Sequence, residues 1–142
     1  MKQWIDSATL RAMRFNGDEA TRTFFDALHE RRFQSTRCEP CETTVYPPRA
    51  FCPACGSEEV TWVDMPTEGT LHAFSQQHRS LRFFTPDVLG LVELPGCEGL
   101  VLTRIDAPLN TLEIGQRVAL DFFEISDDLT VHQFRPTGGG PS

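Results

Sequence analysis

The amino-acid sequence predicts a mainly β protein with N-terminal helices, in which a small metal-binding ribbon precedes a closed five-stranded barrel. Three observations lead to this prediction: two Cys-x-x-Cys pairs, a series of short strand patterns after them, and apolar residues at helical spacing before them. The predicted segments are residues 1–33 (helical), 34–64 (ribbon), 65–136 (barrel) and 137–142 (a disordered tail).

Two helices are expected before the ribbon, at residues 7–15 and 18–31. In the second, Phe24, Phe25 and Leu28 stand at helical spacing. Two adjacent phenylalanines cannot both face one narrow stripe. Either one of them is exposed on the free chain and covered by a partner, or both pack on the ribbon.

The four cysteines Cys38, Cys41, Cys52 and Cys55 form two Cys-x-x-Cys pairs with ten residues between them. A two-residue spacer lets both thiolates of a pair turn toward one cation, and two pairs complete a tetrahedral site. Zinc is the usual occupant of such a site, and iron can occupy the same four sulfurs. Disulfides or a redox pair are the alternatives, which the closeness of the pairs disfavours.

Four thiolates leave no open position for water or substrate, so the predicted metal is structural. Residues 38–55 are too few to bury a core of their own, and the metal would hold them together. Between the pairs, Tyr46, Pro47, Pro48 and Arg49 form an extended segment that is either a contact surface or only shapes the ribbon.

Five strand patterns follow the ribbon within about seventy residues. They cover residues 69–78, 88–94, 100–105, 117–125 and 129–134. Short turns separate them, and no βαβ crossover would fit. This spacing is typical of a small closed barrel such as the OB-fold.

The charge is unevenly distributed along the 142 residues, whose formal net charge is −7. Residues 1–56 carry eight basic and seven acidic side chains, whereas residues 57–142 carry five and thirteen. An acidic barrel repels phosphate backbones, so nucleic-acid binding is disfavoured. The sequence has no apolar run of membrane-helix length and no signal-peptide pattern, so we expect a cytoplasmic protein away from membranes.

No catalytic motif can be recognised, and we predict no catalytic residues in this chain. The sequence lacks Gly-x-Ser-x-Gly, His-Glu-x-x-His and a Gly-rich phosphate loop. Cys97 is interpreted as a small apolar or loop residue. His78, Arg79 and Arg82 form the strongest polar cluster, which either contacts an acidic ligand such as a phosphate or is simply solvated.

Several motifs together resemble those of a known family. Beyond the cysteine pairs, they are Pro-Pro-Arg at 47–49, Ile-Gly-Gln-Arg-Val at 114–118 and Phe-Arg-Pro at 134–136. The chain resembles, over residues 20–136, the rubredoxin-like zinc-ribbon plus OB-fold family long labelled as a domain of unknown function. Glu42 departs from the glycine usual after the first pair.

The resemblance implies a non-catalytic accessory subunit in a hetero-oligomer. Members of this family accompany thiolase-fold enzymes that act on acyl-CoA esters, with acyl-CoA at or near the shared interface. It implies zinc at the four cysteines, with iron as the alternative. Residues that we expect at the partner interface are Phe24, Phe25, Leu28, Tyr46, Pro47, Pro48 and Arg49.

Four other functions stay open at this point. The chain is alternatively the accessory subunit of an acyl-CoA hydratase, a free-standing acyl-CoA binder, a rubredoxin-like electron carrier, or a single-stranded nucleic-acid-binding OB-fold protein. The last of these requires a basic groove with stacking aromatic residues, and the acidic barrel argues against it.

Overall fold

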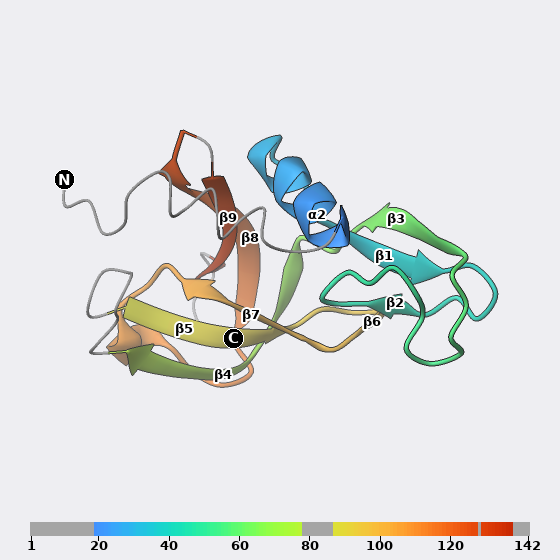
Figure 1. Ribbon diagram of the computed structural model, residues 1–142. Helices are drawn as coiled ribbons and strands as arrows, with labels where there is room; N and C mark the ends of the chain where they lie inside the picture. Colours follow the sequence, from blue (N-terminus) through green and yellow to red (C-terminus); the bar gives the residue numbers. More distant parts are fainter. Residues whose placement is uncertain (1–18, 78–86, 128, 138–142) are drawn as a thin grey trace.

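The computed structural model describes residues 19–77, 87–127 and 129–137, and it shows one helix beside a small sheet and a barrel (Figure 1). The elements are α2 (Glu19–His29), β1 (Gln34–Cys38), β2 (Thr44–Val45), β3 (Val60–Asp64), β4 (Glu68–Gln77), β5 (Asp87–Glu93), β6 (Cys97–Glu98), β7 (Leu100–Ile105), the 3-10 helix η1 (Leu109–Thr111), β8 (Arg117–Ser126) and β9 (Leu129–Pro136). The predicted class, mainly β with a ribbon and a five-stranded barrel, is confirmed.

The ribbon contains a four-stranded sheet in the order β3-β1-β2-β6. β1 pairs with β2 and with β3 in antiparallel register, and β6 runs parallel to β2. β6 comes from the connection between the barrel strands β5 and β7, so it belongs to the barrel half of the chain. The barrel therefore extends one strand into the ribbon sheet, on the right in Figure 1.

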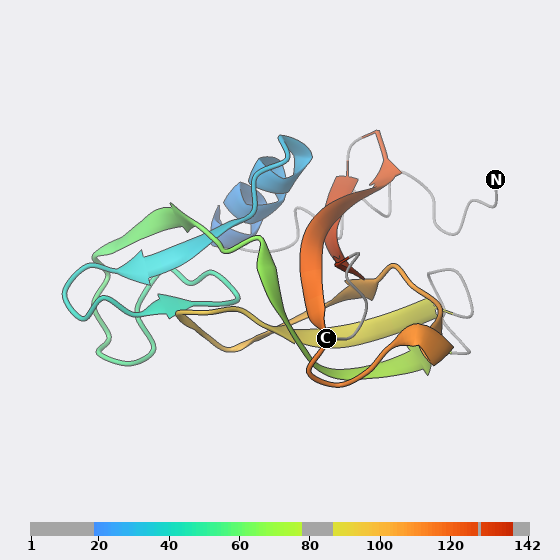
Figure 2. The ribbon, with the colours of Figure 1, turned by 180° about the vertical axis from the view of Figure 1, so that it is seen from behind.

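The barrel is closed, with the strand order β4-β5-β7-β9-β8. The sequence patterns predicted all five strands, and the observed ends differ by a residue or two. β7 and β9 pair in parallel, through Arg104 opposite Gln133 and Ile105 opposite Phe134. The long strands β8 and β9 pair along most of their length, as Figure 2 shows from behind.

Alternation along the barrel strands places apolar side chains inside. Leu71, Val92, Val101 and Phe134 are each fully buried. Gly90 lies among them, and this position requires glycine because a Cβ atom there would come within 2.8 Å of the Ile105 side chain. The core thus forms from residues that are far apart in the chain.

Helix α2 packs against β9 and β1, and so it covers the place where the barrel meets the ribbon (Figure 1). Its buried residues are Ala20, Phe24, Ala27 and Leu28, which share one face at helical spacing. The helix ends near Arg31, which adopts a left-handed conformation with φ 63°. The Arg31 guanidinium then pairs with Glu124 of β8.

Some predictions fall outside the described residues. These are the helix at residues 7–15, the tail beyond residue 137, and the cluster His78, Arg79 and Arg82. Thr137 is described, and its N–H donates to the Arg117 carbonyl at 3.2 Å. No helix in the described part of the chain combines the length and the apolar character that a bilayer crossing requires.

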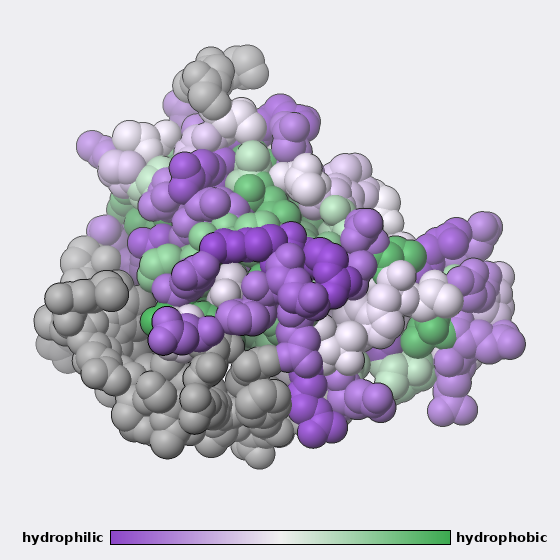
Figure 3. Space-filling model, turned by 90° about the horizontal axis from the view of Figure 1, so that it is seen from above, coloured by the Kyte–Doolittle hydropathy of each residue, from purple (hydrophilic) through white to green (hydrophobic). Residues whose placement is uncertain are grey.

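The visible surface is mostly hydrophilic. From above, charged and polar residues form a broad band over the middle of the molecule (Figure 3). Apolar residues reach this face in small patches between polar ones, including some at the ribbon end on the right.

Candidate metal centre and domain junction

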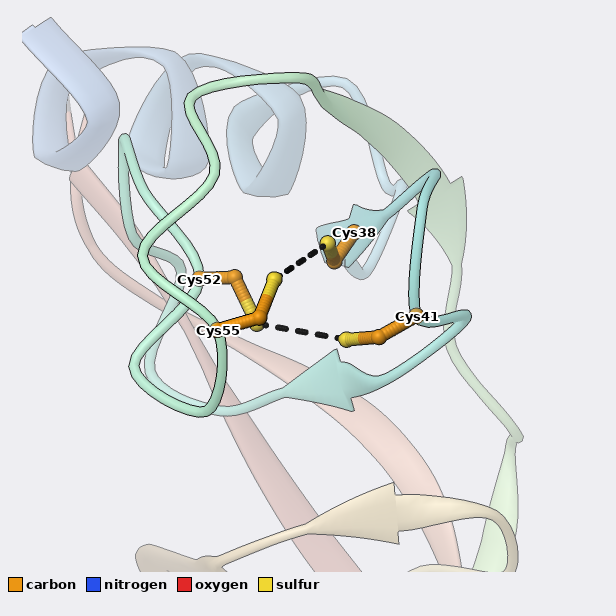
Figure 4. Close-up of side chains that lie close together, drawn as sticks. All are labelled: Cys38, Cys41, Cys52 and Cys55. Carbon is orange, nitrogen blue, oxygen red and sulfur yellow. Dashed lines mark hydrogen bonds between the residues drawn. The ribbon is translucent and has the colours of Figure 1, made fainter.

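The four predicted cysteines converge at one end of the ribbon (Figure 4). Their four Sγ atoms all lie within 4.8 Å of one another. The Cys38 and Cys55 sulfurs are 3.5 Å apart, and the Cys41 and Cys52 sulfurs are also 3.5 Å apart. Residues from two separate turns therefore form a single cluster.

Each cysteine pair is held by the same type of turn. The Glu42 N–H donates to the Cys38 carbonyl at 2.9 Å, and the Gly56 N–H donates to the Cys52 carbonyl at 2.7 Å. Both residues are left-handed, with φ 61° at Glu42 and 78° at Gly56. Glu42 thus takes the conformation that glycine usually supplies, and the first turn keeps the geometry of the second.

The thiols of the cluster influence one another's ionisation. The Thr43 hydroxyl, 3.2 Å from the Cys41 sulfur, and the Thr43 amide lower the pKa of Cys41 to about 6. The Cys41 amide acts to lower the pKa of Cys38, but burial and the neighbouring thiols outweigh it and raise that pKa to about 12. Four thiolates this close repel one another unless a cation lies among them.

The arrangement fits a tetrahedral metal ion. With metal–sulfur bonds of about 2.3 Å, neighbouring sulfurs of a tetrahedral site lie roughly 3.8 Å apart. The observed separations of 3.5 Å, and the upper limit of 4.8 Å, are close to that value. A metal held by these four residues would have a closed shell, so it would stabilise the fold and leave no position for substrate.

A second polar site joins the ribbon to the barrel. The Tyr46 hydroxyl of the ribbon lies 3.0 Å from Nε2 of His132 on β9. Nδ1 of the same ring lies 2.8 Å from the Thr103 hydroxyl on β7. Around them pack the rings of Phe24, from α2, and Phe33, whose centroids are 6.0 and 5.3 Å from that of His132.

Both nitrogens of the His132 ring have polar partners. The Thr103 hydroxyl at Nδ1 also donates to the His132 carbonyl at 3.3 Å. The Tyr46 hydroxyl lies at Nε2, and burial and nearby Cys97 raise its pKa to about 12. Burial lowers the pKa of His132 to about 4, and the ring is neutral at pH 7.

The residues expected at a partner interface occupy different environments. Phe24 and Leu28 are 6 % and 0 % exposed, so they belong to the core. Phe25 and Pro48 are half-buried, and Pro47 and Arg49 are exposed. Phe24 is the buried one of the two adjacent phenylalanines, and Phe25 packs against the core while staying partly exposed. Surface contact stays a prediction for Phe25 and the Pro-Pro-Arg segment.

The sequence did not indicate the junction residues His132 and Thr103. Both stand in ordinary strand patterns, and no motif distinguishes them from other inward-facing positions. Tyr46 was noted only as part of the segment between the cysteine pairs. Its role depends on a contact with a residue 86 positions away.

One curated relative is the probable enoyl-CoA hydratase alpha subunit of Thermomonospora curvata. The two sequences are 34 % identical over 115 residues, which is 80 % of this chain. The match covers 36 % of the relative, so this chain spans about a third of the length of that protein.

Two solved structures share the fold. The first, described as an Ltp2-ChsH2(DUF35) aldolase, has a TM-score of 0.75 and 32 % identity, and the match covers 84 % of this chain and 96 % of that one. The second is a DUF35 protein of unknown function from Sulfolobus solfataricus, with a TM-score of 0.63, 16 % identity and coverages of 91 % and 94 %. The second likeness concerns the fold alone.

Two family models match consecutive parts of the chain. The rubredoxin-like zinc ribbon domain of ChsH2 matches residues 25–61, and the C-terminal OB-fold domain of ChsH2 matches residues 62–123. Their junction lies in β3, close to the predicted boundary between ribbon and barrel. The chain therefore belongs to the ChsH2-type DUF35 family of proteins with a zinc ribbon and an OB-fold.

Proposed function

We propose that this protein is a non-catalytic accessory subunit of a thiolase-superfamily enzyme, such as a thiolase, retro-aldolase or acyltransferase, that acts on acyl-CoA esters. The observation that carries the proposal is the 32 % identity, over 84 % of this chain, to the ChsH2 (DUF35) component of an aldolase. The subunit would stabilise its catalytic partner and help to close the CoA or acyl pocket at the shared interface.

The described residues support an accessory role. Four cysteines occupy a closed cluster, and the buried histidine is used in a structural junction. Catalysis in the complex is accordingly assigned to the partner. We propose cytoplasmic assembly into a hetero-oligomer with that partner.

We propose zinc as the metal at Cys38, Cys41, Cys52 and Cys55. The sulfur separations fit a tetrahedral site, and four thiolates with no open position are typical of structural zinc. Metal analysis of the purified protein tests this assignment. One equivalent of zinc is expected, and a red, iron-loaded protein would contradict it.

A specific observation favours a second candidate, an accessory role with an acyl-CoA hydratase. The curated relative from Thermomonospora curvata is named as a probable enoyl-CoA hydratase alpha subunit. This chain corresponds to about a third of that protein. The identity of the catalytic partner decides between the two candidates.

The experiment is purification of the tagged chain from its native host, followed by identification of co-purified proteins by mass spectrometry. The partner is then prepared with and without this chain, and both samples are assayed on acyl-CoA esters. We expect a stoichiometric thiolase-like protein that is inactive or unstable alone. A lone partner with unaltered kinetics would contradict the proposal.

Titration of the isolated chain with acyl-CoA esters is the matched control. We expect no binding without the partner, because the pocket is proposed to form at the interface. Tight binding by the isolated chain would instead favour a free-standing acyl-CoA binder.

A further inference from the structure

Three large apolar side chains are strongly exposed in the described part of the chain. They are Phe51 at 49 %, Leu102 at 62 % and Ile114 at 73 %. Leu102 lies on the outer face of β7, opposite Leu91 of β5. Phe51 differs from the other two because it lies on the ribbon, directly before the predicted metal ligand Cys52.

Phe51 belongs to a short surface segment, residues 47–54, which we call the ribbon loop. Its exposed members are mostly apolar and small, with one aromatic residue and one cation. They are Pro47, Arg49, Ala50, Phe51, Pro53 and Ala54. An apolar segment of this kind loses little side-chain entropy when a partner covers it, because proline and alanine have few rotamers to lose.

The ribbon loop is held in place on both sides. Before it, the Tyr46 N–H donates to the Glu98 carbonyl at 3.0 Å, and the Tyr46 hydroxyl contacts His132. Within it, the Arg49 N–H donates to the buried Thr36 hydroxyl at 2.9 Å. Cys52 then joins the sulfur cluster. Phe51 and Arg49 are therefore presented from a fixed backbone.

Arg49 gives the loop a charge opposite to that of the molecule. The net charge of the chain is −7, and the other ribbon arginine, Arg37, is paired with Glu42. Within the described residues, the exposed Arg49 side chain makes no ion pair. A cation beside an exposed aromatic ring fits an apolar socket that has carboxylates at its edge.

We propose that the ribbon loop is a docking surface for the catalytic subunit, with Phe51 in an apolar socket and Arg49 paired with carboxylates at its edge. This inference rests on the proposed function and adds a location and a chemistry to it. The fixed backbone lowers the ordering cost of binding, so a small contact can contribute much of the affinity. The metal would then serve the interface by holding the loop in its docking conformation.

The test measures the affinity and kinetics of the metal-loaded chain for the catalytic subunit identified above. The variants are Phe51→Ala and Arg49→Glu, with Leu102→Ala as a matched control that removes an exposed apolar side chain elsewhere. Phe51→Ala should weaken binding by about tenfold or more, as truncation of an aromatic anchor does. Arg49→Glu should slow association and remove much of its salt dependence. Leu102→Ala should bind within about twofold of wild type.

Metal content and circular dichroism of each variant verify the fold. Arg49→Glu changes an exposed side chain that is not a metal ligand, so it tests the proposal even if Phe51→Ala perturbs the ribbon. Unchanged binding by both loop variants would overturn the proposal, and weaker binding by Leu102→Ala would then place the contact on the barrel. A wild-type chain that binds no catalytic subunit would overturn the proposed function and this inference with it.

Discussion

At the scale of single residues, His132 is the clearest case of a polar group whose state is set by its surroundings. The ring is 9 % exposed, and its two nitrogens lie 3.0 Å from the Tyr46 hydroxyl and 2.8 Å from the Thr103 hydroxyl. A protonated ring would place a charge among aromatic rings. Burial therefore favours the neutral ring.

The pKa of His132 predicts how stability depends on pH. Its value is about 4 in the folded protein, below the ordinary value of 6.5 that applies to the unfolded chain. Below about pH 6.5, the unfolded chain binds a proton that the folded protein does not. The free energy of unfolding should therefore fall between about pH 6.5 and 4, by roughly 3 kcal/mol in total from this residue.

An NMR titration of the metal-loaded protein measures this pKa directly. The His132 ring signals should stay in their neutral positions from about pH 8 down to 5. A midpoint near the ordinary value would contradict the buried Tyr46–His132 contact. Urea unfolding at several pH values then gives the corresponding change in free energy.

Glu42 provides a second residue-scale prediction. It holds φ 61° without the freedom of glycine, whereas Gly56 holds 78° in the equivalent turn. Glu42→Gly should keep the metal and raise the free energy of unfolding by about 1 kcal/mol, because a left-handed conformation strains side chains with a Cβ atom. Loss of the exposed pair with Arg37 offsets this only slightly.

Chemical unfolding of the metal-loaded proteins is the measurement. The matched control is Gly56→Ala, where no atom lies within 4 Å of the added Cβ, so only the backbone strain is introduced. It should lower stability by about the same 1 kcal/mol. A destabilised Glu42→Gly variant would show that Glu42 has another role in the turn.

At the scale of elements, β6 is the short strand that connects the barrel to the ribbon. It pairs in parallel with β2, through Thr44 opposite Cys97 and Val45 opposite Glu98. Gly99 follows it with φ 101°. The backbone there approaches the ribbon closely, because a Cβ atom at Gly99 would lie 2.5 Å from the Tyr46 carbonyl oxygen.

Gly99→Ala should therefore separate β6 from the ribbon. The added methyl meets a backbone oxygen that cannot rotate away, and we expect a loss of about 2 kcal/mol or more. The control is Gly96→Ala, which has φ 73° but no atom within 4 Å of the added Cβ. It should cost about 1 kcal/mol from strain alone.

Urea unfolding compares the two glycine variants, and amide hydrogen exchange locates the effect. In Gly99→Ala, protection should fall at the β2 and β6 amides before it falls inside the barrel. An equal loss of stability in both variants would mean that the close approach of residue 99 to the Tyr46 carbonyl adds nothing to the cost of the substitution.

At the scale of the whole molecule, the ribbon and the barrel share structural elements where they meet. β6 lies in the barrel half of the sequence and in the ribbon sheet, and α2 packs against both parts. The cysteine cluster and the Tyr46–His132 contact both hold the segment between the cysteine pairs. Loss of the metal should therefore affect more than the residues that bind it.

Cys52→Ser removes one buried sulfur of the cluster and should abolish metal binding. Structural zinc can contribute on the order of 10–16 kcal/mol of apparent folding free energy, so the ribbon should unfold. The barrel should also lose stability, because β6 and His132 lose their ribbon partners. Metal analysis and NMR spectra of the ribbon and barrel amides measure the two effects separately.

The control is Cys97→Ser, which replaces the half-buried cysteine outside the cluster. It should keep one equivalent of metal and a folded ribbon. A soluble, metal-free Cys52→Ser protein with unchanged folding would contradict a structural role for the metal.

Local patterns determined much of this protein. The cysteine spacing predicted the cluster, and short apolar strand patterns separated by turns predicted all five barrel strands. These features depend on residues close in the chain. Spacing within a turn or a strand directly sets which side chains lie on one face, so the sequence alone is sufficient to predict them.

The tertiary structure decided everything that depends on distant pairing. The pairing of β6 with β2, the parallel closure of β7 on β9 and the partners of His132 join residues that are far apart in the sequence. Helical spacing likewise could not choose between Phe24 and Phe25. Packing against Phe33, Tyr46 and His132 buried Phe24, because only the folded chain brings those rings together.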